Sequence, residues 1–180
     1  MASKKEEDNE IGAFLLQHLA LLKKGYSFSG YERDKVWLQR NGSFIDISGV
    51  SGADSISDGR AAIFWDPDND GDTDILLRAM HGPATFFFEN KIGQQNATLR
   101  VSLEGTTSGR DAFGSVVRVK SAAGIQTKVK HGGGRYCAQS DPRMLFATRG
   151  DIEWVEITWP NGRKQRVVPT SSSIRVVENR

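Results

Sequence analysis

Five aspartates alternate with other residues in the stretch Asp66-Pro67-Asp68-Asn69-Asp70-Gly71-Asp72-Thr73-Asp74. Carboxylates brought this close together repel one another strongly when no cation lies between them. A calcium ion reverses that repulsion because it accepts many oxygen ligands in a flexible shell. Gly71 suits the sharp turn of such a loop, since only glycine adopts positive φ without strain. The stretch therefore predicts a calcium-binding loop.

The expected ligands are the side-chain carboxylates of Asp66, Asp68, Asp70 and Asp74. Asp72 is expected to contribute its backbone carbonyl oxygen. The loop differs from an EF-hand, because its twelfth position is Leu77, where an EF-hand needs a bidentate glutamate. Residues 60–65 and 75–77 are short apolar runs typical of strands. An acidic turn without metal is the alternative, but a plain turn needs only one or two such residues.

Composition restricts the class of protein. The chain has 180 residues, with 38% hydrophobic and 26% charged residues, which is typical of a soluble globular protein. Its net charge of +2 and diffuse basic residues argue against nucleic-acid binding. No apolar run is long enough to span a membrane. Residues 1–10 are acidic, unlike a signal peptide. The single cysteine, Cys137, excludes an internal disulfide and is expected to be a buried, inert thiol.

Periodicity predicts a mostly β chain with one N-terminal helix. Residues 1–9 are expected to be disordered, and apolar residues recur at helical spacing over 11–24. We expect this amphipathic helix to cover a sheet edge or an open face. A membrane-surface helix is less favoured because its polar face is not basic. About ten strands follow, and the run Phe86-Phe87-Phe88 predicts a strand that is buried on both faces.

Segments on both sides of the aspartate loop resemble known families. Residues 36–48, and residues 58–65 with the loop, resemble an FG-GAP/VCBS repeat. Four later segments resemble an ASPIC/UnbV domain: residues 109–119, 132–136, 139–143 and 155–162. The resemblance covers roughly residues 26–170. It implies kinship with the cartilage acidic protein family and its bacterial relatives.

Proteins of that family are mostly exported, bind calcium and contain β-propellers, and FG-GAP repeats generally serve adhesion and recognition. The resemblance implies an extracellular or periplasmic, non-catalytic module that recognises a protein or a glycan. It divides the chain into a tail and helix (1–25), a calcium-binding repeat (26–95) and a β-sandwich (96–180). One repeat cannot close a propeller, so we expect a single blade-like sheet packed on the sandwich. Its unpaired edges favour self-association.

Two other functions stay open. A carbohydrate-binding module could use four tryptophans as stacking platforms: Trp37, Trp65, Trp154 and Trp159. Two of these tryptophans side by side on the surface would favour glycan binding. Buried tryptophans would favour a structural role, with recognition by other surfaces. A calcium-dependent hydrolase is the second alternative. His131-Gly132-Gly133-Gly134 resembles the oxyanion-hole segment of lipases, but the Gly-x-Ser-x-Gly motif is missing, so we predict no catalytic residue.

Two short motifs are interpreted separately. Arg149-Gly150-Asp151 spells an integrin-binding tripeptide, which composition alone produces by chance in a few per cent of chains of this length. Asn96-Ala97-Thr98 is a glycosylation sequon, which matters only in a eukaryotic secretory route.

Overall fold

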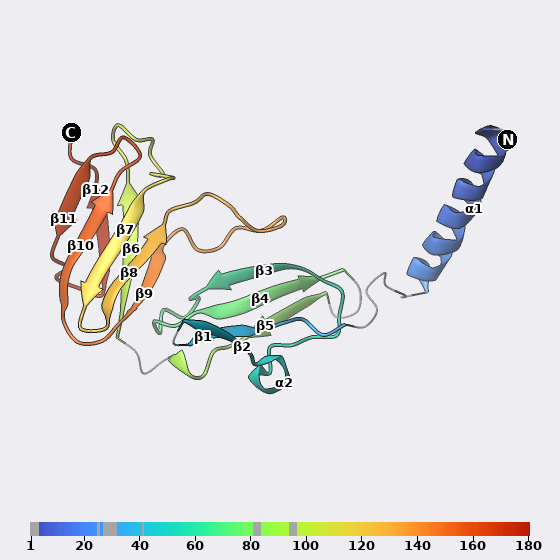
Figure 1. The fold of residues 1–180 in the computed structure, drawn as a ribbon, viewed down its shortest axis with the longest axis horizontal. Helices are drawn as coiled ribbons and strands as arrows, with labels where there is room; N and C mark the ends of the chain where they lie inside the picture. The colour runs from blue at the N-terminus through green and yellow to red at the C-terminus, as the bar shows by residue number, and fades with distance from the viewer. Residues whose placement is uncertain (1–3, 25, 27–31, 41, 81–83, 94–96) are drawn as a thin grey trace. The chain divides into compact units, whose positions relative to one another are not determined.

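The fold is mostly β, as predicted (Figure 1). The computed structural model describes residues 4–24, 26, 32–40, 42–80, 84–93 and 97–180, so Asn96 of the sequon lies outside the described residues. Contacts divide the chain into two compact units. The first comprises Met1–Ala61 and Leu77–Phe86, and the second comprises Ala62–Leu76 and Phe87–Arg180. The predicted boundary between residues 95 and 96 stays a prediction.

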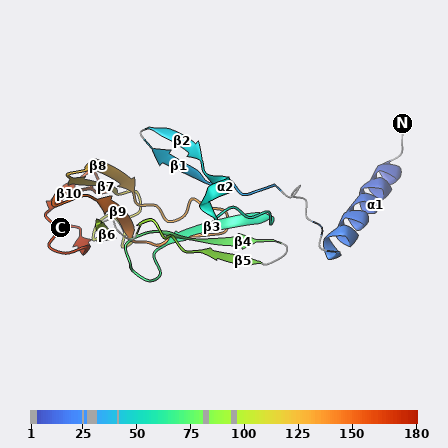
Figure 2. The same cartoon turned by 90° about the horizontal axis from the view of Figure 1, so that it is seen from below.

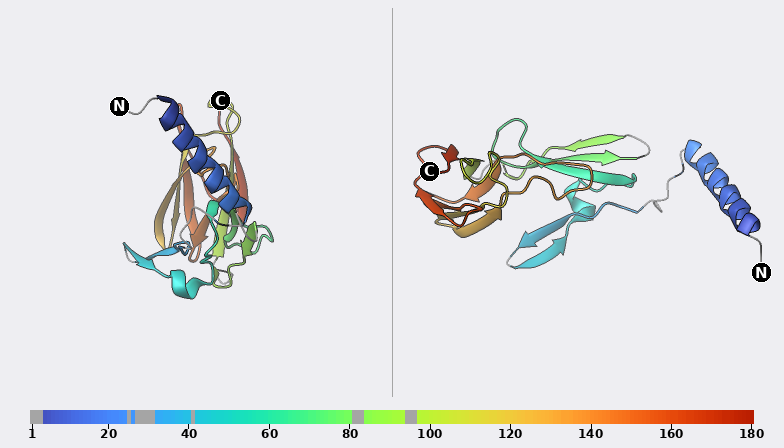
Figure 3. Two further views of the ribbon diagram at one scale, coloured as in Figure 1. Left: turned by 90° about the vertical axis from the view of Figure 1, so that its right-hand side faces the viewer. Right: turned by 90° about the horizontal axis from the view of Figure 1, so that it is seen from above.

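The first unit begins with helix α1 (Lys4–Lys23), which Figure 3 shows as one continuous helix. Residues 4–9, predicted to be disordered, are therefore helical. The large apolar side chains of α1 that the sequence assigned to one face are mostly exposed. That α1 covers a sheet edge stays a prediction. Among the described residues, no helix is both long and apolar enough to cross a bilayer.

A hairpin follows, formed by β1 (Trp37–Arg40) and β2 (Ser43–Asp46). The short helix α2 (Ser48–Ser51) was not predicted. Strands β3 (Gly59–Trp65), β4 (Asp74–Ala79) and β5 (Thr85–Phe88) then form one sheet in that order (Figure 2). The aspartate loop joins β3 to β4, as predicted.

The prediction that the phenylalanine run is buried on both faces is wrong. Phe87 is 51% exposed, whereas its neighbours Phe86 and Phe88 are partly buried. Strand β5 lies at the edge of its three-stranded sheet. An antiparallel sheet of this size commonly has one covered face and one open face, and alternate side chains then point to water.

The second unit contains a β-sandwich. One sheet has the order β11-β10-β7-β8 and the other has the order β12-β6-β9. The strands of the first sheet are β7 (Val116–Ser121), β8 (Gly124–Val129), β10 (Ile152–Thr158) and β11 (Lys164–Val167). Those of the second are β6 (Ala97–Glu104), β9 (Met144–Thr148) and β12 (Ser173–Val177).

Alternation along the strands builds the core of the sandwich. From Leu99 onward, every second residue of β6 is buried, and β10 shows the same pattern through Val155 and Ile157 to Trp159. Both sheets contribute to one apolar cluster: Leu99, Val101, Leu103, Ala112, Val117, Val119, Met144, Phe146, Val155, Ile157, Trp159 and Val176. Burial of this area is the main favourable term in the folding of the sandwich.

A buried glutamate closes one end of the sandwich. Glu178, just after β12, accepts hydrogen bonds from the backbone N–H groups of Thr106, Thr107 and Ser108, each 2.9 Å from Oε2. Its Oε1 accepts from the hydroxyls of Thr107 and Ser108 and from Nδ2 of Asn161 at 2.6 Å. Burial alone would raise the pKa of Glu178, but these hydrogen bonds outweigh it and hold the pKa well below its usual range.

This carboxylate makes the stability of the sandwich depend on pH. Because its pKa is lower in the folded state, its contribution is complete above the unfolded pKa of about 4.3 and is lost as pH falls below that value. We expect Glu178→Gln to lower the unfolding midpoint at neutral pH and to flatten the loss of stability in acid. Denaturant unfolding from neutral pH to about pH 3 measures this change. Exposed Glu153→Gln is the control, and an equal response from both variants would contradict the assignment.

Candidate metal centre

The aspartate loop turns sharply between β3 and β4. Asn69 and Gly71 have positive φ angles of 61° and 101°. A Cβ atom at Gly71 would lie 2.5 Å from Oγ1 of Thr98, so glycine is required there by space as well as by backbone conformation. The sequence therefore assigned Gly71 its role correctly, and Thr98 adds a steric reason that only the fold reveals.

Two short-range hydrogen bonds shape the loop. Oδ1 of Asp68 accepts from the backbone N–H of Asp70 at 3.2 Å, and Oδ1 of Asp70 accepts from that of Asp72 at 3.0 Å. An aspartate that bonds the backbone two residues later forms a local turn of its own. Each of these carboxylates keeps its second oxygen for another ligand.

Three of the predicted ligands converge. One carboxylate oxygen from each of Asp66, Asp68 and Asp70 lies within 4.8 Å of the other two. Asp68 and Asp70 are exposed, whereas Asp66 is only 5% exposed and its Oδ1 has no hydrogen-bond partner among the described residues. An unpartnered buried carboxylate oxygen is costly, and a bound cation would remove that cost. Hard oxygen donors of this kind fit calcium or magnesium.

The other two aspartates of the loop, Asp72 and Asp74, are buried like Asp66. Asp74 is buried, and its Oδ1 accepts a hydrogen bond from the backbone N–H of Asn90 at 2.7 Å. Asp72 is also buried, and in the part of the chain that the structure describes its Oδ2 has no hydrogen-bond partner. Burial, followed by the charges of the other four aspartates, raises the pKa of Asp72 to about 6. The predicted roles of Asp74 and of the Asp72 carbonyl as ligands stay predictions.

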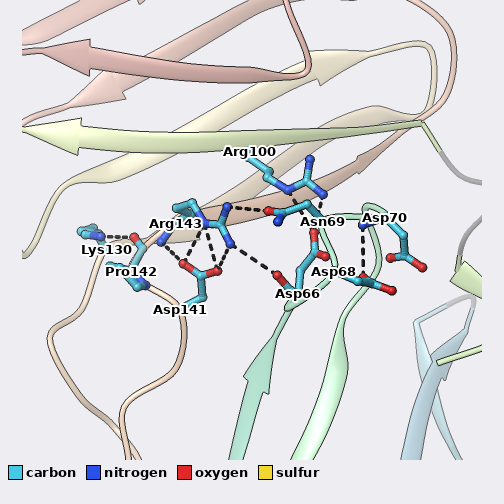
Figure 4. A network of polar contacts seen from close by, with 9 residues as sticks. All are labelled: Asp66, Asp68, Asn69, Asp70, Arg100, Lys130, Asp141, Pro142 and Arg143. Carbon is cyan, nitrogen blue, oxygen red and sulfur yellow. Dashed lines mark hydrogen bonds and ion pairs between the residues drawn. The ribbon is translucent and has the colours of Figure 1, made fainter. Parts of the chain in front are cut away.

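Two arginines of the same unit bind this loop, and the sequence analysis missed both (Figure 4). Arg100, on β6, donates to Oδ2 of Asp66 from Nε at 2.9 Å and from Nη2 at 2.5 Å. Arg143, just before β9, donates to Oδ1 of Asn69 at 2.9 Å and to the Asp66 carbonyl at 3.4 Å. One feature of the sequence bears on Arg100: it lies between the apolar residues Leu99 and Val101, so its side chain points away from the apolar face of the strand.

Arg143 also holds the segment that leads into β9. Its Nε and Nη2 donate to both oxygens of Asp141, with Nη2 2.6 Å from Oδ2. Burial would raise the pKa of Asp141, but the hydrogen bonds from Arg143 outweigh it and lower the pKa. Figure 4 shows the resulting chain of contacts from Lys130 and Pro142 through Arg143 to the loop.

The other candidates have different surroundings. Cys137 is exposed, so the prediction of a buried thiol is wrong; it lies in the long connection between β8 and β9, outside the core. Trp159 is buried, and the ring of Trp154 lies 4.5 Å from the guanidinium of Arg166. Trp37 and Trp65 are exposed but belong to different units.

The two remaining motifs lie in loops. His131 is exposed, and a Cβ atom at the next residue, Gly132, would lie 2.8 Å from the ring of Phe113. A glycine is therefore needed there for packing, in keeping with a structural role. Residues 149–151 are exposed between β9 and β10, with φ of 65° at Gly150. The interpretation of that tripeptide as chance stays a prediction.

Comparison with known families agrees with part of the resemblance. Residues 105–179 match the family model described as ASPIC and UnbV. The match runs from the loop after β6 to the residue after Glu178, so it includes Arg143 but not Arg100 or the aspartate loop. No curated protein matches the chain. The ASPIC/UnbV part of the resemblance is confirmed, and the FG-GAP/VCBS part stays a prediction.

The pairing of Arg100 with Asp66 gives a direct test. In calcium-free buffer, Arg100→Ala leaves a buried carboxylate without its partner, which costs about 3–5 kcal/mol of unfolding free energy. Calcium should reduce this loss, because the ion would compensate Asp66 in place of the guanidinium. Denaturant unfolding with and without calcium measures both effects.

The control is Arg175→Ala, which removes an exposed ion pair with Glu104 in the same sheet as Arg100. A surface pair of this kind contributes at most about 1 kcal/mol. Equal losses for the two variants would contradict the role assigned to Arg100.

Proposed function

We propose that the chain is a calcium-binding, non-catalytic recognition module. The observation that carries the proposal is the buried Asp66, whose unpartnered Oδ1 lies in a loop where the carboxylates of Asp68 and Asp70 converge with its own. Repulsion among these carboxylates disfavours the loop in the absence of a cation. A divalent ion supplies the missing charge and ligates the free oxygens.

Calcium is the favoured ion because of the way the loop is built. Its oxygens come from flexible side chains on one short segment, and calcium tolerates irregular shells of six to eight oxygens. Magnesium demands a near-ideal octahedron and loses its waters reluctantly, so it should compete poorly. The loop and the sandwich belong to one compact unit, so an ion bound to the loop stabilises that unit by mass action.

The proposed role is to hold a recognition surface. The ion would fix the loop, the loop holds Arg100 and Arg143, and Arg143 holds the segment around Asp141. The partner is a protein or a glycan, and the family resemblance favours an extracellular or periplasmic setting, where calcium is abundant. Self-association through the edges of the β3-β4-β5 sheet is a further expectation.

Calorimetry tests the metal directly. Chelator-treated protein should bind calcium, Asp70→Ala should abolish or greatly weaken that binding, and magnesium should bind poorly. At free calcium about a hundredfold above the dissociation constant, the unfolding free energy should rise by roughly 2.7 kcal/mol. Asp151→Ala is the matched control, since Asp151 is also an exposed loop aspartate. Absence of calcium binding, or unchanged binding in Asp70→Ala, would refute the assignment.

An esterase assay tests the proposal that the protein is non-catalytic. The sequence has no Gly-x-Ser-x-Gly motif to accompany His131, and no nucleophile with its usual local context. We expect no turnover of generic esters such as p-nitrophenyl acetate beyond the rate in buffer, with or without calcium. Turnover that disappears in His131→Ala but survives in His18→Ala, which alters a half-buried histidine of α1, would show instead that the protein is a hydrolase.

A further inference from the structure

A cavity of about 450 Å³ lies in the second unit, next to the two arginines that bind the aspartate loop. Its wall combines positive charge with aromatic rings. The charged and aromatic residues of the wall on which the inference rests are Phe64, Trp65, Lys130, His131, Arg135 and Arg143. A cavity of this size suits a small ligand, and convergent polar groups around aromatic surface are what fix such a ligand in place.

Three cations in this wall have no ion-pair partner in the described part of the chain: Lys128, whose Nζ donates to the Leu145 carbonyl, and the two that carry the argument, Lys130 and Arg135. Arg135 donates from Nε to the hydroxyl of Ser140 at 3.0 Å, and Nζ of Lys130 donates to the carbonyl of Pro142. Neither cation takes part in an ion pair within the described part of the chain. Arg143 differs, because Asp141 neutralises it. Lys130 is buried, and the carboxylates of Asp111 and Asp141 act on its charge only from beyond ion-pair distance, so its burial is incompletely compensated. An anion in the cavity would supply the missing counter-charge.

Trp65 supplies the apolar part of the wall. Trp65 is 41% exposed and is one of the residues that line the cavity, and the guanidinium of Arg135 lies 4.3 Å from the centre of the neighbouring Phe64 ring. Arg135 is thus held between Phe64 and Ser140, with a fixed position at the cavity wall. A large flat ring beside fixed donors suits a ligand that has one apolar face and many hydroxyl groups.

The structure disfavours an extended peptide as the occupant. Peptides commonly bind by adding a strand to a free sheet edge. Here the chain itself occupies that position on β3: the backbone N–H of Phe64 donates to Oγ of Ser140 at 3.2 Å, and the N–H of Asp141 donates to the Phe64 carbonyl at 3.4 Å. A compact ligand in the cavity does not need this edge.

We propose that the cavity binds a saccharide that carries a carboxylate or a sulfate group. A sugar ring would stack on Trp65, and the acidic group would lie against Arg135 and Lys130. This inference rests on the proposed recognition function and names the class of its ligand. It also links the ligand to the metal centre, because Arg143 lies in the cavity wall and donates to Asn69 of the aspartate loop.

Calorimetry in calcium-containing buffer tests the proposal with four probes. Trigalacturonate and a sulfated disaccharide derived from heparin carry the two kinds of acid, cellotriose is the neutral saccharide, and tetraglutamate is the acidic peptide. We expect at least one acidic saccharide to bind about tenfold or more tightly than cellotriose and tetraglutamate, a difference of about 1.4 kcal/mol. If trigalacturonate binds more tightly, the acidic group is a carboxylate; if the heparin-derived disaccharide binds more tightly, it is a sulfate. Binding should weaken at raised salt, because ions screen the attraction.

Variants locate the site. Arg135→Gln and Trp65→Ala should each weaken acidic-saccharide binding about tenfold or more, as expected for central contacts. Arg166→Gln is the matched control, because Arg166 also lies over an aromatic ring, Trp154, but does not line the cavity. Thermal melts verify folding, and exposed Arg135 keeps the test valid if Trp65→Ala is unstable.

Four outcomes would overturn the inference: equal binding of cellotriose, tighter binding of tetraglutamate, unchanged binding in Arg135→Gln, or no binding of any acidic saccharide. A calcium titration of the same samples separates the two proposals. If calcium binds and no acidic saccharide does, the ligand class is wrong and the calcium-binding module stands. If calcium also fails to bind, the proposed function itself is wrong.

Discussion

The burial of Asp66 is the constraint on which the rest of the site depends. A carboxylate removed from water needs compensating charge or hydrogen bonds, and the four neighbouring aspartates make that need greater. Arg100 compensates one oxygen of Asp66 and leaves the other without a partner. The protein itself therefore compensates the buried charge of Asp66 only in part, through Arg100. Such a loop can form on the scaffold of the unit and still gain from a bound cation.

The same network joins parts of the chain that are distant in sequence. Arg143 contacts the loop through Asn69 and contacts Asp141 at the other end of its guanidinium. Asp141 in turn bonds the backbone of Phe64, at the end of the strand that leads into the loop. These contacts form a closed circuit, so displacement of one member disturbs both the loop and the cavity wall. A planar guanidinium with several donors in fixed directions suits such a junction, and a lysine could not replace it.

The sequence predicted what depends on local pattern. Spacing alone identified the aspartate loop and the role of Gly71, and periodicity identified a mostly β chain with one N-terminal helix. Contacts between residues that are distant in sequence were missed. The residues that flank Arg100 and Arg143 in the sequence give no sign that these arginines bind the aspartate loop. Local pattern also misled for the phenylalanine run, because apolar composition does not tell whether both faces of a strand are covered.

The pairing of β6 with β12 has a consequence for synthesis on the ribosome. The two strands lie side by side and parallel, with Ser173 opposite Arg100, yet β12 is the last strand of the sandwich to leave the exit tunnel. Contacts this distant in sequence form late, because the intervening chain must first be closed into a loop. β6 therefore stays without its partner strand until β12 has been synthesised. The hydrogen bonds that Glu178 accepts from residues 106–108 form only after that. Nascent chains should therefore bind chaperones up to this step, and the sandwich should become protease-resistant abruptly.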